Sequence, residues 1–404
     1  MRRTAVALMI FLALAFSAVA AEEKSPSYSF KFSGYFKGDL AYDRARVTSG
    51  NYALSVLDEP ENDLTSITAR ESRFGLDFAW KENEIQTDAR FEFDFYGLGA
   101  SENKPGAMLR HAYLQVTKGR WSLLAGQTSD IISPLVPKTV NYTVCWDQGN
   151  IGYRRPQLRI TAWANASERV KLSAAVGAFR SLGGNLDNDA VDDGADAGMP
   201  TFQGRLALAA TLPGNRKLEI GFSGHYGREE YVDTEKLSET FGKTKRIESW
   251  SAAADLKVAF CECFEFAGEF FAGQDLGAYY GGVGQTVNIL KEEIASMGAW
   301  GQLSVKPLER AWLNIGYGFD DPHDNDFVIP EGTKVNQSFI DMNSVILGSI
   351  MYSVTSTVTA MLEVSQLTTD YIRYDYDAGA KKGTITDASH DDLRVQFAMK
   401  AAIK

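Results

Sequence analysis

A strict alternation of apolar and polar residues is the feature that most constrains the fold of this chain. In residues 91–101, FEFDFYGLGAS, phenylalanines occupy positions 91, 93 and 95, while Glu92 and Asp94 lie between them. Successive side chains of a β-strand point to opposite faces, so this segment has one apolar face and one charged face. Such a strand fits a water-soluble sandwich, whose apolar face packs on a second sheet, or an outer-membrane barrel, whose apolar face contacts lipid.

The number and spacing of similar segments favour the barrel. Alternation predicts sixteen strands, at about residues 28–42, 73–81, 85–97, 107–117, 121–128, 156–165, 169–180, 201–211, 217–228, 247–260, 264–273, 298–306, 311–319, 339–353, 357–373 and 391–403. Short turns alternate with long polar loops along the chain, which is the arrangement of outer-membrane barrels. We therefore predict an all-β fold, a transmembrane antiparallel β-barrel of about 16 strands with short periplasmic turns and long extracellular loops.

Other architectures fit the sequence less well. No stretch after the leader has 18 successive apolar residues, so no transmembrane helix is predicted. No repeat of 20 to 50 residues indicates a propeller or a solenoid. A ring of sixteen strands is too wide for its own side chains to fill, so the barrel predicts an aqueous channel.

The N-terminal segment has the pattern of a signal peptide. Arg2 and Arg3 precede an apolar run, and Ala18 and Ala20 occupy the small positions of a cleavage site. We expect residues 1–20 to be removed and residues 21–404 to form the barrel in the cell outer membrane. Loss of the two arginines would move the formal charge from −11 to −13, which argues against nucleic acid as a partner.

The three cysteines are too few for a disulfide framework. Cys261 and Cys263 have a single residue between them, and Cys145 lies far away in the sequence. A bridge across one residue is expected to be strained, and a metal site would lack further ligands. We expect structural thiols.

Charged residues on the polar faces of the strands are the candidates for the channel wall. Rings of charged side chains tune which ions pass through a pore, although most such residues are simply solvated wall. The predicted wall and selectivity residues are Lys37, Arg73, Asp77, Arg90, Glu92, Asp94, Arg155 and Arg159.

The connection at residues 129–155 differs from the other loops because it is apolar and contains Pro134 and Pro137. An apolar loop gains little from exposure to water, whereas folding into the barrel would bury it and narrow the pore. We predict a constriction loop with Asp130, Lys138 and Asp147 near the narrowest point. The alternative is a loop that packs on the rim or on a neighbouring subunit.

Signals for catalysis and cofactors are weak. The four histidines do not form an HExxH motif, and the sequence contains no GxSxG or GxGxxG motif. His225 is expected to face inward as part of the wall rather than as a catalyst. We therefore expect no enzyme activity, no catalytic residues, no cofactor and no metal. A barrel enzyme acting on lipids, a soluble exported carbohydrate-binding protein and a non-conducting structural barrel are the alternatives.

Four segments resemble a known family. GYFKGDLAYD (34–43), SRFGLDFA (72–79), MLRHAYLQV (108–116) and LLAGQTSDIISPLVP (123–137) are similar, in order and spacing, to stretches of the DcaP-like porins of Gram-negative bacteria. The resemblance is clearest over residues 28–165. The final residue, Lys404, departs from the aromatic residue with which outer-membrane barrels usually end, while the last strand keeps its alternation.

The resemblance implies a function for the chain. It implies homotrimers of sixteen-stranded barrels that contact outer-membrane lipid and lipopolysaccharide and pass small polar solutes, often anions such as dicarboxylates. Under it, Arg73 and Arg90 would belong to a basic wall and residues 129–155 to the constriction. Because Asp77, Glu92 and Asp94 lie on the same strands, the charge preference stays open in the sequence.

Overall fold

The computed structural model describes residues 27–48, 52–60, 62–101, 104–189, 191–234 and 241–403. The predicted signal peptide lies outside these residues. Short helices occur only in connections, namely α2 (Asp193–Asp196), η1 (Gly277–Tyr279), η2 (Gly282–Gly284) and η3 (Asp324–Asp326). The described part otherwise consists mainly of strands, which are β1 (Ser27–Asp43), β2 (Leu64–Thr68), β3 (Arg73–Glu82), β4 (Ile85–Ser101), β5 (Lys104–Lys118), β6 (Trp121–Ser129), β7 (Arg154–Ser167), β8 (Val170–Phe179), β9 (Thr201–Leu212), β10 (Arg216–Val232), β11 (Thr244–Cys261), β12 (Phe264–Gln274), β13 (Ala295–Leu308), β14 (Ala311–Pro322), β15 (Gln337–Ser353), β16 (Val358–Asp377) and β17 (Lys382–Ile403).

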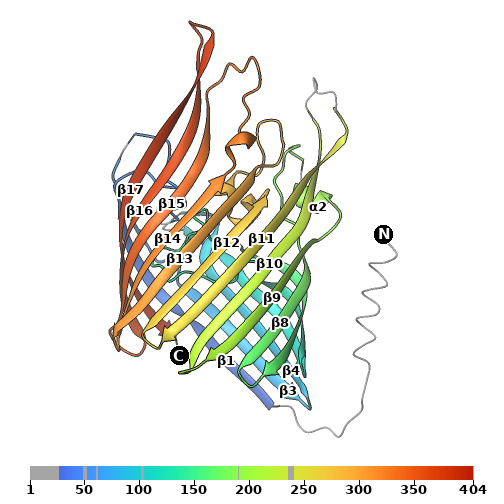
Figure 1. Cartoon of the computed structure of the whole chain (residues 1–404), viewed down its shortest axis with the longest axis vertical. Helices are drawn as coiled ribbons and strands as arrows, with labels where there is room; N and C mark the ends of the chain where they lie inside the picture. The colour runs from blue at the N-terminus through green and yellow to red at the C-terminus, as the bar shows by residue number, and fades with distance from the viewer. Residues whose placement is uncertain are drawn as a thin grey trace.

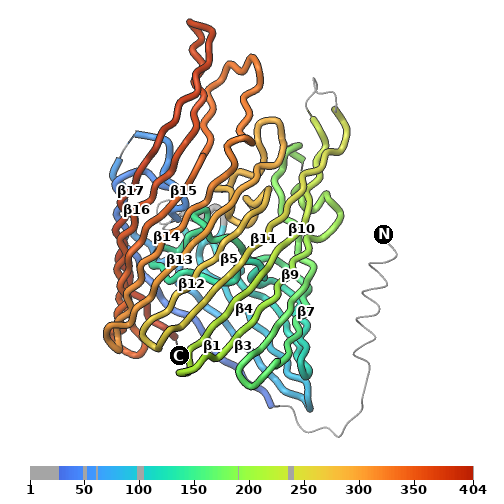
Figure 2. Tube along the Cα trace, in the orientation of Figure 1, coloured from blue at the N-terminus to red at the C-terminus, as the bar shows by residue number. Residues whose placement is uncertain are grey.

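The strands form one closed antiparallel barrel (Figures 1 and 2). Closure is made by β1, which pairs with β17 from Gly34 opposite Ile403 to Asp43 opposite Arg394. The other edge of β1 pairs with β3 in its first half and with β2 in its second half. Because β2 and β3 share one position in the ring, the seventeen strands make a barrel of 16. The predicted fold class is confirmed.

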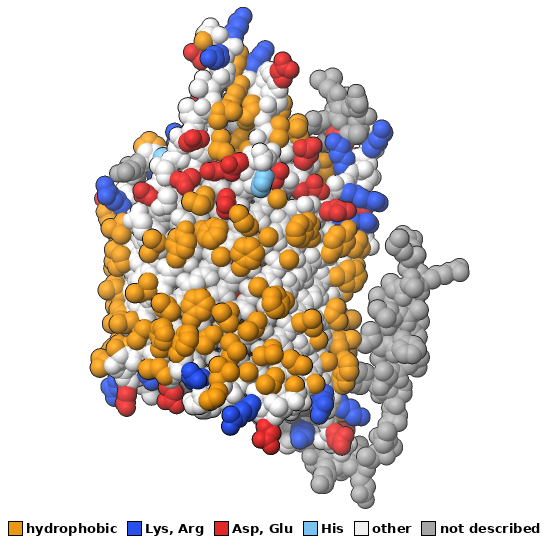
Figure 3. Space-filling model, viewed as in Figure 1, with side chains coloured by type: hydrophobic (Ala, Val, Ile, Leu, Met, Phe, Trp, Pro, Cys, Tyr) orange, Lys and Arg blue, Asp and Glu red, His pale blue; other side chains and the backbone are white. Residues whose placement is uncertain are grey.

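The outer surface of the barrel carries a broad apolar belt. Figure 3 shows hydrophobic side chains across the middle of the barrel, with charged side chains gathered above and below them. Exposed members of the belt come from strands all around the ring and include Phe32, Phe91, Leu206, Phe222, Ile315 and Phe397. Contiguous exposed apolar surface of this extent is unfavourable in water and favourable against hydrocarbon. The soluble sandwich is excluded, since its apolar faces would be covered by protein.

Among the described residues, no helix has the length and apolar character needed to cross a membrane.

The predicted strands differ from the observed ones at the long hairpin of β16 and β17. We predicted a loop at residues 374–390, but the two strands continue as a ladder up to Asp377 opposite Lys382. Figure 1 shows this hairpin rising above the rest of the barrel. Beyond the belt both strand faces meet water, so the sequence there has no apolar alternation to reveal the strand. β2 was missed for a different reason, because its five residues, LTSIT, are too few to establish an alternation.

The expectation of free structural thiols is wrong for two cysteines. Cys261 and Cys263 form a disulfide across the turn between β11 and β12, with Cα atoms 5.2 Å apart. This distance lies within the ordinary range for disulfides, so the turn brings the two residues close enough despite the single residue between them. Cys145 is a free, buried thiol.

The apolar belt predicts that a charged residue introduced at one of its positions lowers the stability of the barrel. Phe222 lies on β10 and its side chain is 64% exposed on the outer face. Phe222→Arg should lower the free energy of unfolding in lipid vesicles by about 2–4 kcal/mol, because an arginine would enter hydrocarbon. Urea titration followed by tryptophan fluorescence measures this change, with Phe222→Leu as the apolar control. Equal stability of the two variants would contradict an outward-facing Phe222.

Candidate pore and inner loop

Residues 130–153, which connect β6 to β7 and are called the inner loop below, fold into the barrel. Most of this segment is buried, including Ile132, Val140, Thr143 and Ile151. Strands on several sides of the ring contact it. The segment predicted as a constriction loop is therefore inside the barrel rather than on its rim.

Inward-facing carboxylates and amides of the wall hold the backbone of the inner loop. Glu363 on β16 accepts hydrogen bonds from the N–H groups of Val140 and Asn141, at 2.7 and 3.2 Å. Three further wall side chains accept hydrogen bonds from backbone N–H groups of the loop. These are Gln203 from Ile131 at 3.0 Å, Glu269 from Leu135 at 2.7 Å and Gln302 from Lys138 at 2.8 Å. An irregular segment has no ladder partners for its N–H groups, so these wall residues satisfy groups that would be costly to bury unpaired.

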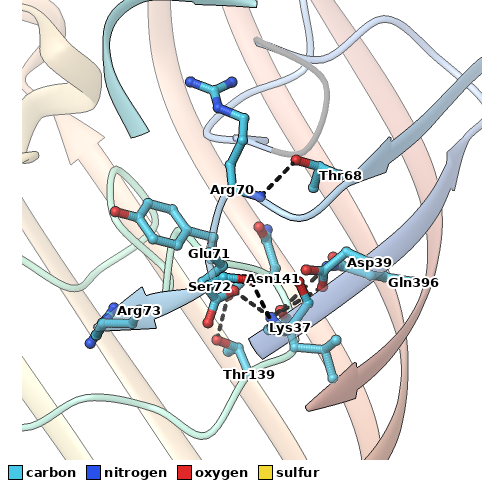
Figure 4. A network of polar contacts seen from close by, with 12 residues as sticks. Lys37, Asp39, Thr68, Arg70, Glu71, Ser72, Arg73, Thr139, Asn141 and Gln396 are labelled. Carbon is cyan, nitrogen blue, oxygen red and sulfur yellow. Dashed lines mark hydrogen bonds and ion pairs between the residues drawn. The ribbon is translucent and has the colours of Figure 1, made fainter. Parts of the chain in front are cut away.

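A break in the second barrel strand supplies another anchor (Figure 4). Residues 69–72 separate β2 from β3 and interrupt the ladder of backbone hydrogen bonds. The Ser72 hydroxyl replaces a ladder partner, because it accepts a hydrogen bond from the backbone N–H of Lys37 at 3.0 Å. The Lys37 ammonium pairs with Glu71 and, at 3.1 Å, with Asp39. It also donates to the carbonyl of Val140 at 2.9 Å. Lys37 thus ties the closing strand β1 to the inner loop, and its side chain is buried.

Buried ion pairs hold the inner loop at its ends and near its middle. At its start, Asp130 lies 3.0 Å from the Arg155 guanidinium, which also covers the ring of Tyr279 at 3.9 Å. Asp94 pairs with Arg110, whose guanidinium also donates to the Tyr142 hydroxyl at 2.5 Å. All four charged residues are buried.

Arg110 was missed as an inward residue because it breaks the alternation of its strand. Tyr113 on β5 lies opposite Arg90, which points inward. Strict alternation would therefore turn the odd-numbered residues of β5 inward and the even-numbered ones outward. A bulge at Glu92 and Phe93 shifts the register, so Arg110 points inward as well. A bulge inserts one residue and reverses the faces beyond it. Sequence periodicity alone gives no position for such a shift.

The predicted wall and loop residues divide by burial into two groups. Lys37, Glu92, Asp94, Arg155, Asp130 and Asp147 are buried among protein groups and have structural contacts. Arg73, Asp77, Arg90, Lys138 and Arg159 are only half-buried.

Several half-buried cations line the same stretch of wall. Arg73 lies 3.5 Å from Glu92, and Arg90 lies 3.3 Å from Asp77. Arg159 has no carboxylate within 4 Å among the described residues, and the same holds for two other half-buried cations, Arg154 and Lys400. Of these, Arg154 lies 4.4 Å over the ring of Tyr153, and Lys400 lies 4.9 Å over the ring of Tyr35.

An aromatic cluster packs between the inner loop and the upper wall. Trp146 and Tyr280 stack with ring centroids 4.6 Å apart, and Tyr96 and Tyr142 stack at 3.9 Å. Tyr52 joins both pairs and donates a hydrogen bond to the Tyr280 hydroxyl at 2.8 Å. These residues come from distant segments of the chain, so no local sequence pattern announces the cluster. It stiffens the inner loop against the barrel wall.

His225 lies on the inward face of β10, next to β11 and to the connection between β12 and β13. Its ring nitrogens contact the hydroxyls of Ser251 at 2.6 Å and Ser249 at 2.9 Å, and the ring stacks on Tyr279 at 4.2 Å. The histidine is buried. The described residues contain no group of three or more side chains placed to hold a metal ion.

Asp147 of the inner loop is a buried carboxyl group without a cationic partner within 4 Å in the described structure. Its backbone N–H donates a hydrogen bond to the backbone carbonyl of Tyr280 at 2.9 Å. Its backbone carbonyl accepts one from the side-chain amide of Asn343 at 2.6 Å. Burial raises the pKa of the Asp147 carboxyl to about 7, although a hydrogen bond from the backbone of Gly284 opposes part of this effect. The group is therefore poised to change its charge near neutral pH.

Comparison with solved structures shows where this fold occurs. The outer membrane channel DcaP of Acinetobacter baumannii matches with a TM-score of 0.68 and 17% identity, over 93% of this chain and 98% of that chain. An anion-selective porin from Comamonas acidovorans matches with a TM-score of 0.57 and 11% identity, over 93% of this chain and 100% of that chain. The trimer form of OmpT, an outer membrane protein of Vibrio cholerae, matches with a TM-score of 0.55 and 9% identity, over 93% and 100%. No protein-family model and no curated protein matches the sequence. At these identities the likeness establishes a DcaP-like porin fold.

The Glu363 anchor predicts how the inner loop responds to its loss. Glu363→Ala should lower the free energy of unfolding by about 2–4 kcal/mol, because two hydrogen bonds to a charged acceptor are lost. It should also raise the open-channel current noise, since the freed loop would move within the lumen. Chemical unfolding and single-channel recording measure the two effects. Glu363→Gln keeps one acceptor oxygen and should lie between the variant and the parent, whereas an unaltered Ala variant would contradict the anchor.

The Asp147 carboxyl predicts a dependence of stability on pH. Its pKa is higher in the folded chain than the ordinary value of 3.8, so its contribution is fully present below about pH 4 and is lost as the pH rises through about 7. The melting temperature in detergent should therefore fall between pH 5 and pH 8, and Asp147→Asn should flatten that decline. Identical pH profiles of the two proteins would show that Asp147 does not titrate in this range.

Proposed function

We propose that this chain is an outer-membrane porin, a channel for passive diffusion of small hydrophilic solutes. The observation that carries the proposal is a closed 16-strand barrel with an apolar outer belt and an inward-folded loop held by polar wall residues. An apolar exterior suits a bilayer, and a charged interior suits water. The fold shared with DcaP and with the anion-selective porin supports the same function.

The channel is proposed to run between the inner loop and the wall formed by β17, β1, β3, β4 and β7. That wall presents the half-buried cations Arg73, Arg90, Arg154, Arg159 and Lys400. The inner loop narrows the lumen from the opposite side, with the half-buried Lys138 at its edge. Diffusion through such a gap needs no catalytic group and no cofactor, so we propose a non-enzymatic channel.

The distribution of charge supports a preference for anions. The buried wall acids are neutralised or engaged, since Asp94 pairs with Arg110 and Glu363 caps the inner loop. Arg154, Arg159 and Lys400 have no carboxylate within 4 Å among the described residues. A surplus of cations along a narrow aqueous path raises the local concentration of anions.

We further propose a homotrimer embedded in outer-membrane lipid and lipopolysaccharide. The fold shared with the trimer form of OmpT supports this assembly. The apolar belt supplies the surface for both lipid and neighbouring barrels.

A lipid-directed barrel enzyme is less well supported. The His225 and serine contacts resemble part of a nucleophile–base arrangement, but an orienting carboxylate is not within hydrogen-bond distance of His225 in the described structure. His225 is also buried inside the barrel against Tyr279, whereas a lipid substrate would arrive at the outer face.

Planar bilayer recording tests the proposed function. Stepwise current increases in potassium chloride should show channels, and a tenfold salt gradient should give a reversal potential of the sign for anion preference. The double variant Arg159→Gln/Lys400→Gln should shift this potential toward cation preference, because two unpaired charges leave the wall. Lys243→Gln changes an exposed loop lysine and should leave it in place. Absence of channels from folded protein would refute the porin, and an unshifted potential would refute the role of these two cations.

A further inference from the structure

The turn between β11 and β12 carries the disulfide of Cys261 and Cys263. It belongs to the rim of short connections, opposite the rim from which the hairpin of β16 and β17 rises (Figure 1). Cys261, Glu262 and Cys263 are all exposed. The disulfide is therefore open to water on the periplasmic side of the barrel.

The fold has little need of this disulfide. A disulfide stabilises a protein mainly by restricting the unfolded chain, and the effect grows with the number of residues in the closed loop. Only Glu262 lies between the two cysteines, so the restriction is small. The turn also has other contacts, because Phe260 and Phe264 stack with ring centroids 5.1 Å apart. Exposed disulfides of this kind are the ones that open most readily.

A lysine lies beside one of the two cysteines. The backbone N–H of Lys306 on β13 donates a hydrogen bond to the Cys263 carbonyl at 2.8 Å, one step beyond the pair of Phe264 and Val305. Residues that lie opposite each other in an antiparallel ladder point their side chains to the same face, so the side chains of Lys306 and Cys263 are neighbours.

The charge of Lys306 distinguishes the two sulfur atoms. Lys306 has no carboxylate within 4 Å in the part of the chain that the structure describes. A neighbouring cation favours the thiolate form of a cysteine. Glu262 is bonded to both cysteines and does not separate them, whereas Lys306 neighbours Cys263. Cys263 is therefore the better leaving group when the disulfide is attacked.

We propose that Cys261 and Cys263 form a thiol–disulfide exchange site that accepts two electrons from low-molecular-mass thiols in the periplasm. The inference goes beyond the proposed porin function and does not depend on conductance. A donor thiolate attacks the Cys261 sulfur, the S–S bond breaks, and Cys263 leaves as a thiolate beside Lys306. A second donor thiolate then attacks the donor sulfur of the mixed disulfide and releases the Cys261 thiolate. The donor is oxidised to a disulfide, and the two protons that its thiols gave up to water are matched by two taken up by the cysteines.

Reduction of the folded and of the unfolded chain by dithiothreitol tests the site. The protein in detergent and the same chain in guanidinium chloride are equilibrated with mixtures of reduced and oxidised dithiothreitol, and free thiols are trapped with iodoacetamide and counted by mass spectrometry. The folded barrel should need a ratio of reduced to oxidised dithiothreitol within about threefold of that for the unfolded chain, because the fold gains little from the bridge. A ratio about tenfold or more higher would overturn the site, since the fold would then protect the disulfide as a structural bridge.

The rate of exchange with reduced glutathione tests the role of Lys306. Peptide mapping of the trapped mixed disulfide should place glutathione on Cys261. Lys306→Gln should slow the reaction about three- to tenfold, because the cation beside the leaving thiolate is lost, and Lys306→Arg should keep most of the rate. The matched control is Lys382→Gln in the hairpin on the opposite rim, which should leave the rate unchanged. An unchanged rate in Lys306→Gln, or glutathione on Cys263, would overturn the assignment of Cys263 as the leaving group.

Discussion

The need to pair every backbone N–H and C=O group is the constraint on which the whole structure depends. In hydrocarbon no water can replace a missing partner, so a sheet that crosses it must close on itself. β1 meets this need by pairing with β17 on one edge and with β2 and β3 on the other. Where the ladder fails at residues 69–72, the Ser72 hydroxyl and the Lys37 network replace it with side-chain hydrogen bonds.

Closure with this many strands creates a second requirement, since the interior is too wide to be filled by wall side chains. The inner loop occupies part of that space, and its N–H groups need partners as much as those of a strand do. Glu363, Glu269 and Gln302 provide them from separate strands around the ring. Acidic residues that the sequence predicts as channel wall therefore bind the inner loop instead of facing the water path. We propose that the cations Arg154, Arg159 and Lys400 set the charge of the water path, and we attribute the proposed anion preference to them.

Much of the fold could be predicted from the sequence, because a strand with lipid on one face and water on the other must alternate apolar and polar residues. The alternation is absent wherever both faces of a strand have the same environment. For this reason the upper parts of β16 and β17 were predicted as a loop. The alternation is also disturbed by a bulge, which hid the inward direction of Arg110. The inward folding of residues 130–153 followed from their apolar composition.

The candidate site was less predictable than the fold. Alternation gives the face of a residue but not its partners, so the sequence could not separate the half-buried Arg159 from the buried Arg155. The ion pair of Arg155 with Asp130, and the contact of Lys37 with Val140, depend on the path of the inner loop in space.

The central claim is that solutes pass between the inner loop and the wall that carries Arg159. Its most direct test is modification of Arg159→Cys, in a Cys145→Ala background, with a charged water-soluble thiol reagent during single-channel recording. The account predicts a discrete fall in current as the reagent attaches beside the path, and no fall in the Cys145→Ala parent. A current that stays constant after modification has been confirmed by mass spectrometry would contradict it, because the path would then lie elsewhere in the barrel.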